Sequence, residues 1–346
     1  MSRSLKRFIV VVLLHRNIIR APDQAYEEKR LKRIGLPRSR AFRWRAALAV
    51  ALMLCASMAF GQPQPISGTL SAIGSDTMAG LTLRWAEALT NRYPEVSVQF
   101  QATGSASVPP ALTAGTTRLG PMSRPMNEAE RQAFIDRYGY PPLALRVAKD
   151  ALVLVVHRHN PLNAITRQQA DAIFSTDQAC GASTPIHRWE ELPATRDWPY
   201  GHIALHGRNL ASGTHGLFQA EVLCGGHFRP DISEHPGSSA VVAAVGESPS
   251  AMGYAGYNHL TPMVHALRLI TQDGAEIAPT EQTIQRNEYP LARDLYLYVN
   301  LPPGESLPPA DQAFLSLILS EEGQQIARAA GFVPLPESEL ATQLAW

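Results

Sequence analysis

The sequence predicts an α/β fold with mostly parallel sheets, and two observations carry this prediction. Strand and helix patterns alternate along residues 68–330, as expected where helices connect parallel strands. The run Ala151–Val156 is continuously apolar over the length of one strand, which is typical of a sheet buried on both faces. A chain of 346 residues is also long enough for two domains with separate cores.

Apolar spacing predicts the individual elements in order. Met78, Leu81, Trp85 and Leu89 recur at helical spacing and indicate a helix with a buried face. Thr166 starts a capping box that opens a short helix. We expect strands at 68–73, 96–100, 151–156, 202–206, 252–254 and 295–299. We expect the other helices at 110–115, 127–138, 217–223, 238–245, 311–319 and 321–330.

The N-terminal 61 residues differ in charge from the rest of the chain. Residues 1–61 hold 13 Lys and Arg against 3 Asp and Glu, whereas the remainder holds 18 against 27. The uncharged run 46–60 is too short for a comfortable membrane span, and small residues precede Gln62. We therefore expect 1–61 to be an N-terminal extension plus a cleaved signal peptide for export to the periplasm. An uncleaved anchor helix is the alternative.

The mature chain is acidic, so its net field repels nucleic acid, and no nucleic-acid partner is expected. We also expect it not to be embedded in the membrane. After cleavage two cysteines remain, Cys180 and Cys224. An even number in an exported chain favours a disulfide, and two unpaired buried thiols are the alternative. The sequence shows no Cys/His cluster at metal-ligand spacing, so neither metal nor cofactor is expected.

Four loops rich in Gly, Ser and Thr follow predicted strands: 74–77, 104–107, 122–124 and 207–214. Loops at the carboxyl ends of parallel strands converge in space, and helix N-termini there offer unpaired N–H groups to anions. Arg124 and Arg208 can balance the charge of an anion, because each guanidinium grips two oxygens. A carboxylate at Asp76 would accept a hydrogen bond from a protonated oxyanion and reject one without a proton. The loops therefore predict an oxyanion site.

Each of these residues also has a purely structural interpretation. Asp76, Ser105 and Ser212 are favoured helix N-caps, and Arg124 could form a surface ion pair of little energetic value. Ser238 opens a further helix, where we expect capping instead of ligand contact. We expect Trp85 and Phe218 to be core residues.

The chain resembles the periplasmic phosphate-binding proteins that supply phosphate ABC transporters, the PstS-like branch of the periplasmic binding protein superfamily. The resemblance covers about residues 68–334. Its motifs are Gly74-Ser75-Asp76-Thr77-Met78, Thr103-Gly104-Ser105, Met122-Ser123-Arg124, Asp150-Ala151-Leu152, His157-Arg158-His159-Asn160-Pro161, Ile173-Phe174-Ser175, Gly207-Arg208-Asn209, Ser212-Gly213-Thr214 and Gly253-Tyr254.

The resemblance implies a two-lobe fold of the type II-like class, with inorganic phosphate enclosed between the lobes. It implies 66–150 and 254–346 as the first lobe and 151–253 as the second. It also implies an inner-membrane ABC permease as partner, no enzymatic activity, and a monomer. Carried over by position, the phosphate-binding residues are Ser75, Asp76, Thr77, Gly104, Ser105, Ser123, Arg124, Arg208, Ser212, Gly213 and Thr214.

The third loop departs from the family pattern. Well-studied members have Asp where this chain has Arg124, and a hydroxyl residue where it has Asp76. We hypothesise that the proton-accepting carboxylate has moved to Asp76. The departure leaves open another oxyanion such as molybdate, and a sensing or surface-attachment role is a further alternative. An exported phosphatase or hydrolase built on Ser212 and His215 is disfavoured, because Gly-x-Ser-x-Gly is absent.

Overall fold

The structure, a computed structural model, describes residues 66–343, so the predicted extension and signal peptide lie outside the described residues. The strands are β1 (Gly68–Ile73), β2 (Val96–Gln101), β3 (Leu119–Met122), β4 (Leu143–His157), β5 (Ala164–Thr166), β6 (Ala204–Arg208), β7 (Ser233–His235), β8 (Ala251–Gly256), β9 (Val264–Ala266), β10 (Arg268–Ile270), β11 (Glu276–Ile277) and β12 (Ala292–Val299). The α-helices are α4 (Ala79–Arg92), α5 (Val108–Ala114), α6 (Glu128–Tyr138), α7 (Arg167–Phe174), α8 (Gly213–Glu221), α9 (Ser238–Glu247), α10 (Glu281–Gln285), α11 (Pro309–Ile318), α12 (Glu321–Ala329) and α13 (Glu337–Gln343).

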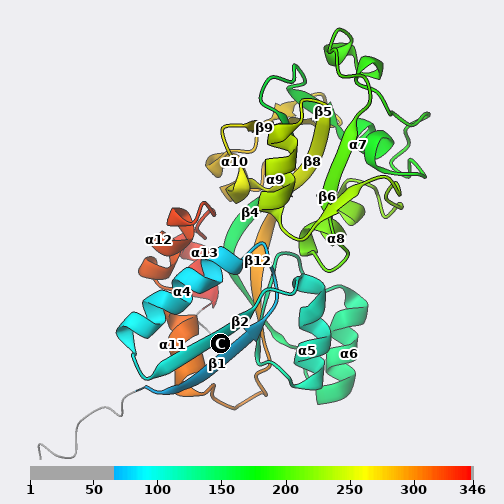
Figure 1. The fold of residues 1–346 in the computed structure, drawn as a ribbon. Coiled ribbons are helices and arrows are strands. Elements are labelled where there is room, and N and C mark those ends of the chain that lie inside the picture. Colours follow the sequence, from blue (N-terminus) through cyan, green and yellow to red (C-terminus); the bar gives the residue numbers. More distant parts are fainter. Residues whose placement is uncertain (1–65, 344–346) are drawn as a thin grey trace, which may run out of the picture. The chain divides into compact units, whose positions relative to one another are not determined.

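A nine-stranded sheet runs through both lobes in the order β2-β1-β3-β12-β4-β8-β6-β7, with β9 paired to β4 (Figure 1). The predicted α/β class is confirmed. The outer strands of each lobe are parallel, as β1 is to β2 and β6 is to β8. The expectation of mostly parallel sheets needs a correction, however, because β4 and β12 run antiparallel to each other and to their neighbours β8 and β3. A chain that crosses to a second lobe and returns places its two crossing strands side by side in opposite directions.

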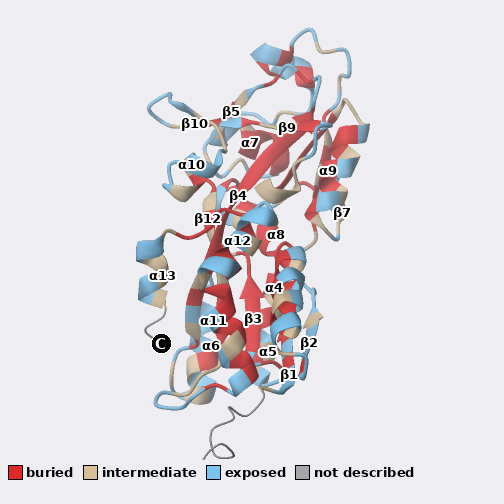
Figure 2. Ribbon diagram, turned by 90° about the vertical axis from the view of Figure 1, so that its left-hand side faces the viewer, coloured by how far each residue is buried: buried red, intermediate tan, exposed pale blue. Residues whose placement is uncertain are grey.

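Each lobe has its own hydrophobic core, and buried residues line the sheet (Figure 2). The first-lobe core packs Trp85 of α4 and Phe314 of α11 against the sheet, and a smaller cluster around Phe134 lies beside it. The second-lobe core surrounds the apolar run Ala151–Val156 and includes Phe218. Trp85 and Phe218 are thus core residues, as predicted, and β4 contributes to both cores.

The lobe boundary at 253/254 stays a prediction. The residues that follow it can be assigned to a lobe by the hydrophobic core in which they are buried. Leu267, Ile284 and Leu291 belong to the same cluster as Ala151–Val156. The cluster around Trp85 begins again only at Leu295. We therefore propose that the chain returns to the first lobe near the start of β12 rather than at β8.

Local capping explains where several helices begin. Thr166 accepts a hydrogen bond from the backbone N–H of Gln169, and Gln169 reaches back to the backbone of Thr166, which confirms the predicted capping box. Asn127 and Glu130 do the same at α6. Residue Gly115 ends α5 in the left-handed conformation, which costs glycine little.

Within residues 66–343 no helix is both long and apolar enough to span a bilayer. No cluster of potential metal ligands occurs in the same range. Cys180 and Cys224 form a disulfide with a Cα–Cα distance of 5.4 Å, across 44 residues of sequence. This confirms the predicted disulfide, and the alternative of two unpaired thiols is wrong.

Replacing both cysteines with alanine should lower the free energy of unfolding by about 2–4 kcal/mol, since the crosslink restricts the unfolded chain. Urea unfolding monitored by circular dichroism measures the change. Anion affinity should stay within twofold, because the backbone N–H of Cys180 donates to Asp171 of α7 and not to the four loops. Unchanged stability under oxidising conditions would contradict the prediction.

Candidate anion-binding site

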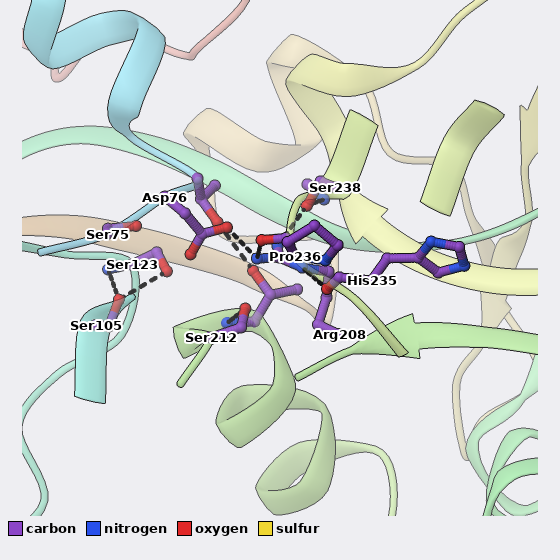
Figure 3. Close-up of polar contacts among 12 residues, drawn as sticks. Ser75, Asp76, Ser105, Ser123, Arg208, Ser212, His235, Pro236 and Ser238 are labelled. Carbon is purple, nitrogen blue, oxygen red and sulfur yellow. Dashed lines mark hydrogen bonds and ion pairs between the residues drawn. The ribbon is translucent and has the colours of Figure 1, made fainter. Parts of the chain in front are cut away.

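The four predicted loops meet where the two lobes face each other (Figure 3). Three of them follow strands β1, β2 and β3 of the first lobe. Strand β1 pairs with both β2 and β3. The fourth follows β6 and leads into α8. Backbone contact joins the lobes directly, because Ala106 N–H donates to the carbonyl of Ala211 at 3.1 Å. Segments far apart in sequence are therefore brought to one place.

The hydroxyl groups of these loops are almost fully removed from solvent. Ser75, Ser105, Ser123, Ser212 and Thr214 are each at most 2% exposed. Buried hydroxyls need hydrogen-bond partners, and several find them among themselves. The Oγ of Ser105 accepts from the backbone N–H of Ser123 at 3.0 Å, and the two Oγ atoms lie 3.2 Å apart. The loops thus form a compact group of donors.

Gly213 allows the lobes to approach closely. A Cβ at this position would lie 2.4 Å from Ser105 Oγ and 2.5 Å from Ser123 Oγ, so any larger residue would force the lobes apart. The N-cap of α8 is Ser212, whose Oγ accepts from the Thr214 N–H at 3.2 Å. Gly104 lies directly against the Ala211 carbonyl with a φ of 99°, a conformation that favours glycine.

Arg208 is held by groups of its own lobe and is only 1% exposed. Its guanidinium donates to Ser238 Oγ and to the Pro236 carbonyl, both at 2.9 Å, and to the His235 carbonyl at 3.3 Å. Its backbone N–H donates to Tyr254 Oη at 3.1 Å. Burial raises the pKa of Tyr254, so this phenol stays protonated.

Asp76 of the first lobe pairs with Arg208 of the second (Figure 3). Asp76 Oδ2 accepts from Arg208 Nη2. Its other oxygen, Oδ1, is buried and has no hydrogen-bond partner among the described residues. A carboxylate oxygen only accepts. This atom can therefore receive a hydrogen bond from a protonated ligand oxygen.

Arg124 pairs with a different carboxylate. Its two terminal nitrogens donate to Glu130 at 2.7 Å each, and Nη1 also donates to the Pro125 carbonyl. Glu130 belongs to the capping box of α6. The guanidinium is thus engaged in a bidentate pair, and this geometry favours the structural interpretation of Arg124 over the expected direct contact with the anion.

Sequence reasoning missed residues that the structure brings to the same place. Ser238 was expected to cap α9, but the N-cap of α9 is Gly237, and Ser238 Oγ accepts from Arg208 instead. Arg293 of β12 and Asp150 of β4 form an ion pair beside Thr214. The motif Pro236-Gly237-Ser238-Ser239 resembles the other loops and could have indicated Ser238. The pairing of Arg293 with Asp150 depends on strand register, which no local pattern reveals.

Two open grooves lie elsewhere on the described surface. One, of about 860 Å³, adjoins the disulfide, and the other, of about 560 Å³, lies near Arg118 and Tyr140. None of the residues of the four loops lines either groove. The hydroxyl residues of the loops are instead buried where the two lobes face each other.

Known proteins resemble this chain in sequence and in fold. A family model described as a PBP superfamily domain matches residues 61–322. The phosphate-binding protein PstS of Pseudomonas aeruginosa is 45% identical over 292 residues, which cover 84% of this chain and 90% of that protein. PstS of Staphylococcus aureus is 25% identical and covers 81% of this chain and 82% of its own length.

Two solved structures share the fold. A substrate-binding protein from Clostridium perfringens with bound phosphate has a TM-score of 0.65 and 24% identity, with 78% of this chain and 100% of that chain covered. An ABC-type phosphate transport receptor from Vibrio cholerae has a TM-score of 0.60 and 21% identity, with 77% and 100% covered. These likenesses confirm the two-lobe architecture expected from the sequence.

Substituting Gly213 with alanine should weaken phosphate binding at least tenfold, because the new Cβ prevents full closure against Ser105 and Ser123. Isothermal titration calorimetry measures the affinity. Gly216→Ala on the same helix is the matched control, since a Cβ there would lie 3.5 Å from Arg124 Nε, an ordinary contact. Equal affinities for the two variants would show that close approach at Gly213 is not required.

Proposed function

We propose that this protein captures inorganic phosphate between its two lobes and delivers it to the permease of an ABC transporter in the inner membrane. The premise is its family: the chain belongs to the PBP superfamily and to the family of PstS phosphate-binding proteins. The observation that carries the proposal is the meeting of four loops from both lobes around the pair of Asp76 and Arg208.

The proposed ligand set matches the chemistry of monohydrogen phosphate. Three unprotonated oxygens need donors, which the hydroxyls, the backbone N–H groups and Arg208 supply. The fourth carries a proton and needs an acceptor, which is Asp76 Oδ1. The residues that we assign to phosphate are Ser75, Asp76, Thr77, Gly104, Ser105, Ser123, Arg208, Ser212, Gly213 and Thr214. Arg124 contributes charge near α8, offset by Glu130.

Binding without catalysis fits the surroundings of the one serine and histidine that sequence analysis considered for hydrolysis. Ser212 Oγ caps α8, and the ring of His215 packs against Phe228 at a centroid distance of 4.4 Å. Burial lowers the pKa of His215. We propose a non-catalytic monomer that is exported to the periplasm by the segment 1–61. Lobe closure around the anion would create the form that docks on the permease.

Arg208→Ala should weaken phosphate binding by at least a hundredfold, since it removes charge-assisted donors and leaves Asp76 unpaired. Calorimetric titration of ligand-stripped protein with phosphate, sulfate and molybdate measures this. The matched control is Arg229→Ala, which removes another buried arginine of the second lobe, one that pairs with the exposed Asp231. This control should lower the melting temperature but keep phosphate affinity within twofold of the wild type. Preference of the wild type for molybdate over phosphate would overturn the proposal and favour another oxyanion.

Asp76→Asn should reduce the preference for phosphate over sulfate at least tenfold. The amide can present an N–H where Oδ1 presented a lone pair, so the site loses its acceptor for the P–OH group and its repulsion of sulfate. Competition titrations at constant pH measure the ratio of the two affinities. Glu130→Gln, which alters a carboxylate paired with Arg124, serves as the control. An unchanged ratio in Asp76→Asn would show that Asp76 does not discriminate between phosphate and sulfate.

A further inference from the structure

A second buried ion pair lies in the two strands that connect the lobes. Arg293 of β12 is directly opposite Asp150 of β4 in the strand register. Its Nε and Nη2 donate to Asp150 Oδ2 at 3.1 and 2.6 Å. Arg293 is 5% exposed and Asp150 is 1% exposed. This pair fixes the plane of the guanidinium and leaves its third nitrogen, Nη1, directed elsewhere.

That third nitrogen reaches the anion site. Arg293 Nη1 donates to Thr214 Oγ1 at 3.0 Å, and Thr214 Oγ1 lies 3.2 Å from Thr77 Oγ1. Thr214 starts α8 in the second lobe, whereas Thr77 belongs to the first loop of the first lobe. The two hydroxyls are buried and have no other hydrogen-bond partner among the described residues. One continuous chain of contacts therefore runs from the connecting strands to both lobes.

The chemistry of the guanidinium limits how these three groups can be hydrogen-bonded. Arginine donates and never accepts, so Thr214 Oγ1 must be the acceptor at 3.0 Å. The two threonines have two O–H protons between them, and their mutual hydrogen bond uses one. Whichever threonine donates in that bond, exactly one O–H proton is left over. It requires an acceptor, and an anion oxygen at the proposed site is one.

We propose that Arg293 is a positioning residue of the phosphate site, which fixes one hydroxyl of the Thr77–Thr214 pair as a donor to the bound anion. This inference rests on the proposed function and deepens it. Because Thr77 and Thr214 belong to different lobes, their hydrogen bond forms only on closure. Arg293 thereby links closure to strands β4 and β12, and it takes the place of the second arginine that sequence analysis assigned to Arg124.

A double-mutant cycle between Arg293 and Thr214 tests the proposal. Arg293→Lys keeps the charge but loses the fork that holds Asp150 and Thr214 together. Alone it should raise the dissociation constant for phosphate roughly tenfold or more. Stopped-flow tryptophan fluorescence should show that the weaker binding comes from a faster dissociation rate, with the association rate within threefold of the wild type. In a Thr214→Val background the same change should cost less than twofold, because Arg293 acts through Thr214.

Matched variants separate this role from a structural one. Arg229→Lys alters another buried arginine, which pairs with the exposed Asp231, and it should affect the melting temperature without affecting phosphate affinity. Thr77→Ser, which keeps the O–H group, should bind phosphate within threefold of wild type, whereas Thr77→Val should lose at least tenfold. The threonine variants keep the test decisive if Arg293→Lys fails to fold.

Each outcome has one meaning. Strong coupling in the cycle together with rescue by Thr77→Ser upholds the proposal. Additive effects, or equal affinities for Thr77→Ser and Thr77→Val, overturn it while the proposed function stands, provided that the wild type binds phosphate and Arg208→Ala does not. Failure of the wild-type protein to bind phosphate would overturn both.

Discussion

The ion pair between Asp76 and Arg208 is the interaction on which the arrangement of the site depends, because it joins one lobe to the other. Taking two charges out of water is expensive, and the cost is offset only when the remaining donors and acceptors are also satisfied. Arg208 meets this condition through Ser238 and two backbone carbonyls. Asp76 does not, because Oδ1 lacks a partner among the described residues. The closed arrangement is therefore complete on one side and unsatisfied on the other.

The site gains little net charge from its arginines. Arg208 is paired with Asp76, Arg293 with Asp150, and Arg124 with Glu130. Burial lowers the pKa of the neighbouring His259 and His235, which favours the neutral form of both imidazoles. Attraction for an anion must then come from oriented dipoles: hydroxyls, loop N–H groups and the N-terminus of α8. Such groups discriminate by hydrogen-bond geometry, which suits a distinction between two dianions of the same shape.

Local sequence patterns predicted much of this, and the failures have two causes. Strand and helix positions and the convergence of four loops follow from residue spacing and from the rule that parallel strands end at one edge. The disulfide follows from the even number of cysteines in the part of the chain after the predicted signal peptide. Arg124 misled because its partner Glu130 was not recognised as a capping-box residue. Arg293 and Asp150 were missed because only the register of β4 and β12 makes them neighbours. The antiparallel direction of these strands was missed for the same reason: it is a property of the whole chain path, and periodicity within a segment carries no information about it.

The unsatisfied acceptor of Asp76 and the surplus O–H of the Thr77–Thr214 pair are complementary demands. A closed site without a ligand would leave both unmet, at a cost of roughly 1–3 kcal/mol for each buried group. Opening the lobes would let water meet both demands. Monohydrogen phosphate meets them without opening, because it offers one proton to the carboxylate and oxygens to the donors. Closure would then be favourable with the correct anion and unfavourable without it, so the same atoms that select the anion also select the conformation that is presented to a partner.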